Sequence, residues 1–267
     1  MLKSISPLWI LPFLSASAMA IAQLSGLSMS ATAAPLQPGQ VVFNDPTPPN
    51  QGAPEGRQRG GASRKGPCDR YRPLAALIPN KQKIVFANTS SPHPTFWFYI
   101  PEPLTSASSI EFTLLDAQNA QADYTYKTTL SASEVKPGLI RLSVPTNATP
   151  LAVGKSYLWT LSLACNAKPA DAVFVQGITQ RVALSAKLQT QLSSAAPLEQ
   201  ATLYAANGIW HEALDAIALQ HRDNPRRLQS AQAWNSLLQH IGLQDLASTP
   251  FSSCCTAPRS LKRHQPQ

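Results

Sequence analysis

The sequence lacks the short motifs that most often mark an active site. It contains no G-x-S-x-G nucleophile elbow and no glycine-rich phosphate-binding loop. His211 and Glu212 do not begin an HExxH zinc motif, because the residue four positions after His211 is Asp215. No CxxC pair provides the ligand spacing of a structural zinc site. We therefore expect no metal and no cofactor, and we interpret His211 and Asp215 as a pair on the surface of one helix.

Long hydrophobic runs are also missing, since none approaches the ~20 residues that a membrane-spanning helix needs. The chain nevertheless begins like a secretory signal peptide, with Lys3, the short apolar run 8–14 and then small residues. We assign residues 1–34 to this signal region, where the A-x-A rule allows cleavage after Ala22 or after Ala33. The sequence thus predicts a protein that is exported to the periplasm or out of the cell.

Acidic residues are scarce, with 14 Asp and Glu against 22 Lys and Arg, and the formal net charge is +8. The excess of positive charge lies at the two ends, in residues 57–72 and 259–263. Between residues 83 and 184, seven basic residues face six acidic ones, so the folded body is nearly neutral. Because an exported protein seldom meets nucleic acid, we expect none as a partner. We interpret the basic ends as solvated arms, with contact to an anionic membrane or envelope surface as the alternative.

Aliphatic periodicity is almost absent from residues 35–72, which are dense in proline, glycine, glutamine and arginine. Such a composition buries too little apolar surface to offset the entropy of ordering, so we expect a linker that is disordered up to about Cys68. At the other end of the chain, residues 252–267 form a basic tail. The folded body lies between these segments, with a β-rich part over residues 73–184 and a helical part over residues 185–251.

Short apolar or alternating runs recur through the β-rich part, separated by clusters of Pro, Gly, Ser and Asn. This pattern is typical of antiparallel strands in a sandwich. We therefore expect an α+β fold, in which an antiparallel β-sandwich of about seven strands is followed by a small helical segment docked on it. The expected strands cover residues 83–88, 95–100, 109–116, 123–131, 138–144, 155–165 and 173–184.

Aromatic residues make up only 7% of the chain, but four of them follow one another in the stretch TFWFYIP. As a strand, this stretch places Phe96, Phe98 and Ile100 on one face. Trp97 and Tyr99 lie on the other face. A strand with two apolar faces must be covered on both, so we expect the C-terminal helices to pack over Trp97 and Tyr99.

The hydrophobic period changes after Ser185 to about three and a half residues, which indicates helices. Ser185 fits an N-cap, Pro197 a first helical position and Gly208 a helix stop. Two further helices follow and end before Pro225 and at Gly242. Part of this region has the spacing of one tetratricopeptide helix pair, which cannot bury its apolar face alone and must dock on the sheet. The matching positions are Tyr204, Gly208, Trp210, Ala213, Ile217 and Pro225.

The chain contains four cysteines, which allow three disulfide pairings in an oxidising compartment. Cys68 lies at the edge of the folded region and Cys165 ends an expected strand. We therefore predict a Cys68–Cys165 disulfide that ties the end of the linker to the sandwich. Cys254 and Cys255 would then form an adjacent disulfide, bridge to another chain or remain thiols.

Several sequence blocks occur together in one characteristic order. They are LAALIP, PTFWFYIP, EFTLLD, PGLIRLSVP, LAVGKSYLWTLSLAC, QRVALS and LYAANGIWHEAL. In this combination the sequence resembles the cyanobacterial family called domain of unknown function 928, over roughly residues 66–250. The resemblance implies a cyanobacterial exported protein and brings no catalytic residues with it. The basic extension 256–267 is not part of the resemblance.

From these features we expect a non-catalytic envelope protein that binds or scaffolds another exported component, either a protein or a polysaccharide. The export signal, the linker and a compact body without reactive motifs all favour this hypothesis.

Two other hypotheses remain. A carbohydrate-binding module would use aromatic side chains of the sheet as a stacking platform. Its candidates are Trp97, Tyr99, Tyr157 and Trp159. An envelope hydrolase would instead need acids and histidines that converge only in three dimensions. Its candidates are His93, His211, Glu102 and Asp116.

Overall fold

The structure is a computed structural model that describes residues 41–48, 56–61, 66–119, 125–166, 171–252 and 254–255. The expected signal region and the tail after residue 255 lie outside the described residues. Among the described helices, none is both long and apolar enough to cross a membrane.

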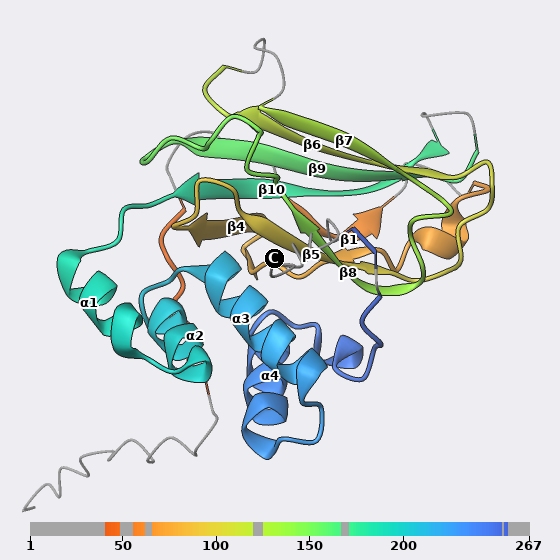
Figure 1. Cartoon of the computed structure of the whole chain (residues 1–267). Helices are drawn as coiled ribbons and strands as arrows, with labels where there is room; N and C mark the ends of the chain where they lie inside the picture. The colour runs from red at the N-terminus through yellow and green to blue at the C-terminus, as the bar shows by residue number, and fades with distance from the viewer. Residues whose placement is uncertain are drawn as a thin grey trace, which may run out of the picture. The chain divides into compact units, whose positions relative to one another are not determined.

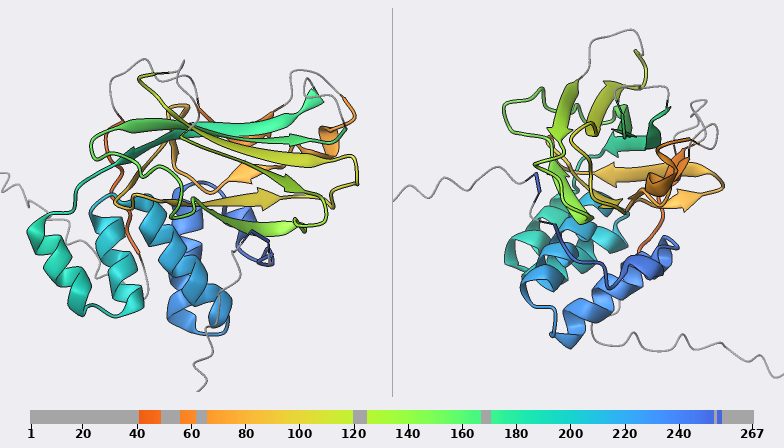
Figure 2. Two further views of the ribbon diagram at one scale, coloured as in Figure 1. Left: turned by 45° about the horizontal axis from the view of Figure 1, so that its top comes forward. Right: turned by 90° about the vertical axis from the view of Figure 1, so that its right-hand side faces the viewer.

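The described strands form one sheet of ten strands, most of them antiparallel. Its main path runs in the order β7-β6-β9-β10-β1-β2-β5-β8. Strand β4 pairs in parallel with β10 and antiparallel with β3. The sheet curls into a half-barrel, as its changing strand direction in Figure 2 shows. The strands are β1 (Arg57–Gly61), β2 (Ala75–Ala76), β3 (Asn80–Lys81), β4 (Ile84–Thr89), β5 (Thr95–Ile100), β6 (Ser109–Asp116), β7 (Tyr126–Ser131), β8 (Gly138–Ser143), β9 (Ser156–Ala164) and β10 (Val173–Arg181).

The single curled sheet differs from the expected sandwich of about seven strands, which is not confirmed. The seven strands expected from the sequence are present as β4 to β10, whereas β1, β2 and β3 were not predicted. Curling brings two parts of the sheet face to face. Phe96 of β5, for example, lies 5.0 Å from Phe112 of β6 between ring centroids. Strands such as β6 and β9 therefore bury alternate residues just as in a sandwich, and alternation alone does not distinguish the two architectures.

Part of the segment expected to be a disordered linker is packed against the body. Val41 and Phe43 are both only 5% exposed. Strand β1 pairs with β10 and with β2. The buried side chain of Gln58 donates hydrogen bonds to the carbonyl oxygens of Ile78 and Ile241, at 2.8 and 3.0 Å. The expectation of disorder was therefore wrong for these residues, because their order comes from partners distant in sequence rather than from local composition.

Four α-helices follow the sheet and lie on one side of it (Figure 1). The side-chain oxygen of Ser185 accepts a hydrogen bond from the Leu188 amide at 3.2 Å, which confirms the predicted N-cap. Gly208 and Gly242 adopt φ of +69° and +70° after α2 and α4, a left-handed conformation that favours glycine at helix ends. The helices are α1 (Ala186–Ser194), α2 (Pro197–Ala206), α3 (Trp210–Asp223) and α4 (Leu228–His240), with short 3₁₀ helices at Asp69–Tyr71 and Gln244–Leu246.

The helices dock on the sheet mainly through α3, which contacts β4 and β5. The indole nitrogen of Trp210, at the start of α3, donates to the Leu77 carbonyl at 2.7 Å. Beyond the helices, the chain returns to the free edge of β8. There Leu139 donates to the Pro250 carbonyl at 2.9 Å and accepts from the Ser252 amide at 2.8 Å. This return segment covers part of an edge that would otherwise expose unpaired backbone groups.

Candidate functional site

The aromatic strand β5 is covered on its inner face by the opposite part of the curled sheet. Phe96, Phe98 and Ile100 are all fully buried. The Phe96 ring lies 5.9 Å from the ring of Trp159 in β9, and Phe98 lies 6.0 Å from the same ring. These side chains form part of the core, where aromatic rings contribute large buried areas.

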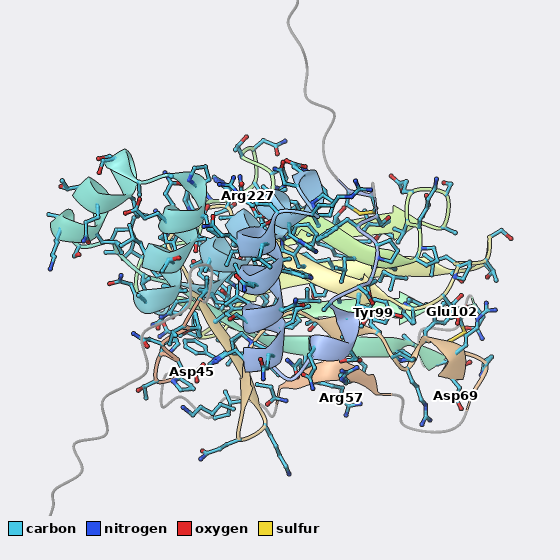
Figure 3. All side chains as sticks on the ribbon, turned by 90° about the horizontal axis from the view of Figure 1, so that it is seen from below. Asp45, Arg57, Asp69, Tyr99, Glu102 and Arg227 are labelled. Atoms are coloured by element: carbon cyan, nitrogen blue, oxygen red, sulfur yellow. A yellow bond between two sulfur atoms is a disulfide. The ribbon has the colours of Figure 1, made fainter. Side chains whose placement is uncertain are left out.

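The outer face of β5 is covered by the C-terminal part of the chain. Trp97 is 2% exposed, its indole nitrogen donates to Asp215 of α3 at 2.9 Å, and its ring meets Phe251 edge-on at 5.6 Å. Tyr99 is half-buried and packs against the core; it lies on the helical side in Figure 3. Trp97 therefore offers no open ring face to a ligand. Tyr157 and Trp159, the other aromatic candidates, are buried as well.

The first two turns of α3 carry a row of ionisable side chains that face the sheet. The Asp215 carboxylate accepts hydrogen bonds from Nε and one Nη of Arg141 in β8, at 2.7 and 2.8 Å. It also accepts the hydrogen bond from the Trp97 indole. His211 is 3% exposed. The interpretation of His211 and Asp215 as a surface pair was therefore wrong. Both point into the interface because the apolar stripe of α3 docks this side of the helix onto β5 and β8.

His211 is held between two threonines. Its Nδ1 lies 2.9 Å from the Thr95 carbonyl oxygen, which can only accept, so Nδ1 carries the hydrogen. Its Nε2 lies 2.9 Å from the hydroxyl of Thr179, whose oxygen is also 3.0 Å from the Ala87 carbonyl. Burial lowers the pKa of His211 to about 4, so the ring is neutral near pH 7 and its Nε2 can only accept. The single hydroxyl hydrogen of Thr179 is shared between this nitrogen and the Ala87 carbonyl. Both ring nitrogens are thus engaged within the protein.

Glu212, the next residue, contacts a different part of the sheet. Its Oε1 accepts from the hydroxyl of Thr89 at 2.6 Å and from the amides of Ser90 and Ser91 at 3.1 and 2.9 Å. Burial raises the pKa of Glu212, although these donors act in the opposite direction. Its Oε2 is buried and has no hydrogen-bond partner among the described residues. The carboxyl group ties the end of β4 to the first turn of α3, where negative charge is favoured.

The remaining hydrolase candidates lie elsewhere. The ring of His93 contacts the Ala148 carbonyl at 3.1 Å. Asp116 pairs with Lys155 at 2.8 Å, and this hydrogen bond, together with the Gln118 amide, lowers the pKa of Asp116. Glu102 is exposed and is labelled in Figure 3 at the end of the sheet away from the helices.

Within the described part of the chain, no hydrogen bond or ion pair joins one hydrolase candidate to another. The described residues also contain no group of three or more His, Cys, Asp or Glu side chains placed to hold a metal ion. The structure therefore does not assemble these candidates into one reacting centre among the residues it describes.

The cysteines form two disulfides. Cys68 and Cys165 are bonded, with their Cα atoms 5.4 Å apart, which confirms the predicted pairing. Cys254 and Cys255 are bonded to each other, so the structure selects the adjacent disulfide among the alternatives.

A feature that the sequence analysis missed is the segment 41–48, which we call the strap. The Phe43 ring meets the ring of Trp210 edge-on at 4.9 Å, and it lies 5.3 Å from the ring of His240. Val41 and Phe43 are buried, whereas Val42 and Asn44 between and after them are exposed. The alternation appears only in the burial, so the one local signal in the sequence is the short apolar run Val41-Val42-Phe43 within a polar segment.

Polar contacts hold the strap against the end of α2. The backbone amide of Asn44 donates to the Ala205 carbonyl at 3.1 Å, and its side-chain amide donates to the Ala206 carbonyl at 2.7 Å. Both carbonyls belong to the last turn of α2, and that of Ala205 also accepts from the Gly208 amide at 3.1 Å. A Cβ atom placed on Gly208 would lie 2.8 Å from the Asn44 carbonyl oxygen, so the turn after α2 needs glycine for this close approach as well as for its φ.

The strap ends in a charged contact. The Asp45 carboxylate lies 2.9 Å from Nε2 of His240 at the end of α4 and 3.7 Å from Nζ of Lys81. Figure 3 labels Asp45 beside the helices, at the opposite end from Glu102. We call the surface that receives the strap the strap groove. It consists of Lys81, Ala205, Ala206, Gly208, Trp210 and His240.

Comparison with known proteins supplies the family. No curated protein matches the sequence. The family model described as "Domain of Unknown Function (DUF928)" matches residues 59–251, which include the whole sheet from β2 onward and the helices but not the strap. This match covers most of the chain, and the chain therefore belongs to the DUF928 family.

Proposed function

We propose that this protein is an exported, non-catalytic module that binds or scaffolds another component of the cell envelope, in a cyanobacterium. The signal-like residues 1–34 and the disulfide between Cys68 and Cys165 support export, because disulfides persist in oxidising compartments.

The observation that carries the binding role is that the helical segment already holds an extended stretch of polypeptide. The strap contacts three helices and a strand through backbone carbonyls, an aromatic ring and an ion pair. Helical repeat folds commonly bind extended segments on such surfaces. The same chemistry suits a segment of another exported protein.

The ionisable residues of α3 support a non-catalytic role. The polar atoms of His211 and Asp215 are engaged by strands of the same chain, and Glu212 is bound to the Thr89–Ser91 loop. A general base must reach a substrate proton, and side chains committed in this way serve to fix α3 on the sheet.

Export is tested by fractionating cells that produce the full chain or a chain without residues 1–34. We expect the full chain outside the cytoplasm and the shortened chain inside it. Recovery of both chains in the cytoplasm would contradict export.

The binding role is tested by crosslinked capture from envelope extracts with the exported chain as bait. We expect a defined partner whose recovered amount rises with the amount of bait. An excess of the same protein without the tag should reduce this recovery. Glu212→Gln and His211→Gln variants should capture the same partner. A hydrolytic activity on envelope material that these two substitutions abolish, with no partner recovered, would overturn the proposal.

A further inference from the structure

We propose that the strap groove is a recognition site for an extended peptide with the pattern aliphatic-x-aromatic-Asn-Asp, which the chain's own residues 41–45 occupy in cis. The partner is a segment of another exported protein that carries this pattern. This inference rests on the proposed binding function and names the site and the chemical class of its ligand.

The strap is bound as a peptide ligand would be. It inserts the alternate side chains of Val41 and Phe43, and its backbone donates one hydrogen bond to the Ala205 carbonyl at the end of α2. The strap lies outside residues 59–251 that the family model matches, whereas every residue of the strap groove lies inside them. The groove therefore lies within the matched family domain, and the strap lies outside the match.

Each position of the pattern has its own contact. The aromatic position is read by Trp210 and His240, which meet the Phe43 ring edge-on. The asparagine is read by the Ala206 carbonyl, which accepts from its side-chain amide, whereas the Ala205 carbonyl accepts from its backbone amide.

The acidic position is read by charge. Asp45 lies between His240 and Lys81, which come from α4 and β3. Beyond it, the strap continues beside a small, open depression lined by Asp45, Pro46, Pro48, Pro79, Lys81, Ile84 and Phe86.

The cis strap sets a threshold for binding. A tethered segment competes at an effective concentration of about millimolar, so a partner peptide at about micromolar concentration must bind roughly 10³-fold more tightly than the strap to displace half of it. Weakening the strap should therefore reveal the site.

The test uses the full exported chain and a labelled peptide of residues 41–48 with blocked ends. Binding is measured by fluorescence anisotropy for the wild type and for Phe43→Ala, which removes the main anchor of the cis strap. We expect at least ~10²-fold tighter binding to Phe43→Ala than to the wild type, since the effective concentration of the competitor falls. A peptide with alanine in place of phenylalanine, or in place of both Asn and Asp, should bind at least ~10-fold more weakly.

The chain offers a matched control in its two turn glycines. The Cβ that Gly208→Ala adds would clash with the backbone carbonyl of the ligand residue that takes the place of Asn44. Gly242 has nearly the same φ, but the Cβ that Gly242→Ala adds has no other atom within 4 Å. In the Phe43→Ala background, we expect Gly208→Ala to lose peptide binding at least ~10-fold and Gly242→Ala to retain it. If Phe43→Ala does not fold, as judged by circular dichroism, Asn44→Ala/Asp45→Ala is used instead, because neither residue belongs to the buried core.

Absence of peptide binding to a folded strap variant, or equal binding to both glycine variants, would overturn the peptide site. Failure of the site is distinct from failure of the function. Capture of an envelope partner that Gly208→Ala leaves unchanged would overturn this site and leave the binding role, whereas absence of any captured partner would overturn the role itself.

Discussion

The indole nitrogen of Trp97 in β5 lies 2.9 Å from Oδ1 of Asp215 in α3, and it joins residues that are 118 positions apart. The same carboxylate receives the guanidinium of Arg141 from β8. One side chain of α3 thus holds two neighbouring strands of the sheet. This contact explains how the helices cover the outer face of the aromatic strand.

Asp215→Ala should lower the free energy of unfolding by about 2–4 kcal/mol, because it leaves the Arg141 guanidinium and the Trp97 indole without an acceptor at a largely buried site. The measurement is urea unfolding at pH 7. Asp245→Ala is the control, since its pair with Arg59 is exposed and should contribute less than about 1 kcal/mol. Equal losses of unfolding free energy for Asp215→Ala and Asp245→Ala would show that the contact of α3 with the sheet contributes no more than an exposed ion pair.

Stability should fall as the pH is lowered from about 6.5 to about 4, because burial lowers the pKa of His211 to about 4 in the folded state. In this pH range the unfolded chain binds a proton at His211 and the folded chain does not. Full protonation therefore lowers the free energy of unfolding by about 3 kcal/mol. Glu212 acts in the opposite sense, since its raised pKa removes stability as the pH rises above its usual range. The contribution of His211 is therefore read from the difference between wild type and His211→Gln in urea unfolding across this pH range. A difference in unfolding free energy that stays constant from about pH 6.5 to about pH 4 would contradict the role of His211.

Replacing Cys68 and Cys165 with serine should lower the free energy of unfolding by about 4 kcal/mol, because their disulfide closes a long loop in the unfolded chain, with a sequence separation of 97. Cys254→Ala/Cys255→Ala is the matched control, since its disulfide joins adjacent residues and restricts no loop. Urea unfolding of both variants measures the difference. A larger loss for the adjacent pair would contradict the loop-closure explanation.

Gly208→Ala should destabilise the protein more than Gly242→Ala. Both positions have φ near +70°, a left-handed conformation that is unfavourable for alanine. Each substitution should therefore lower the free energy of unfolding by about 1–2 kcal/mol. Only Gly208→Ala also displaces the carbonyl of Asn44, which should add about 1–3 kcal/mol. Thermal unfolding gives the difference, and hydrogen exchange should accelerate in residues 41–48 of Gly208→Ala alone. Unchanged exchange of the strap would show that this contact does not hold it.

Iodide should quench the fluorescence of the four tryptophans within the described residues only weakly, because each of these side chains is at most 2% exposed. Soluble oligosaccharides should leave their fluorescence unchanged, since no ring face is free to stack on a sugar. A saturable change on adding a sugar would revive a carbohydrate platform. These residues are Trp97, Trp159, Trp210 and Trp234.

Local sequence patterns reveal those features of the fold that depend on a few neighbouring residues. The N-cap Ser185 and the stop Gly208 were found because capping and left-handed turns depend on one or two residues. The Cys68–Cys165 disulfide was found because the boundaries of the folded body limited the choices. The docked strap and strand β1 were missed, because a few buried residues in a polar segment barely change its composition.

The sequence by itself determined the seven longer strands, the four helices and the two-sided burial of β5, because alternation and helical period follow from the geometry of each element. Only the tertiary structure decided that the sheet curls on itself, that His211 and Asp215 face inward, and that residues 41–48 fill a groove between helices and strand. These features depend on pairing between distant residues such as Trp97 with Asp215 and Asn44 with Ala205, and no local period encodes such pairing.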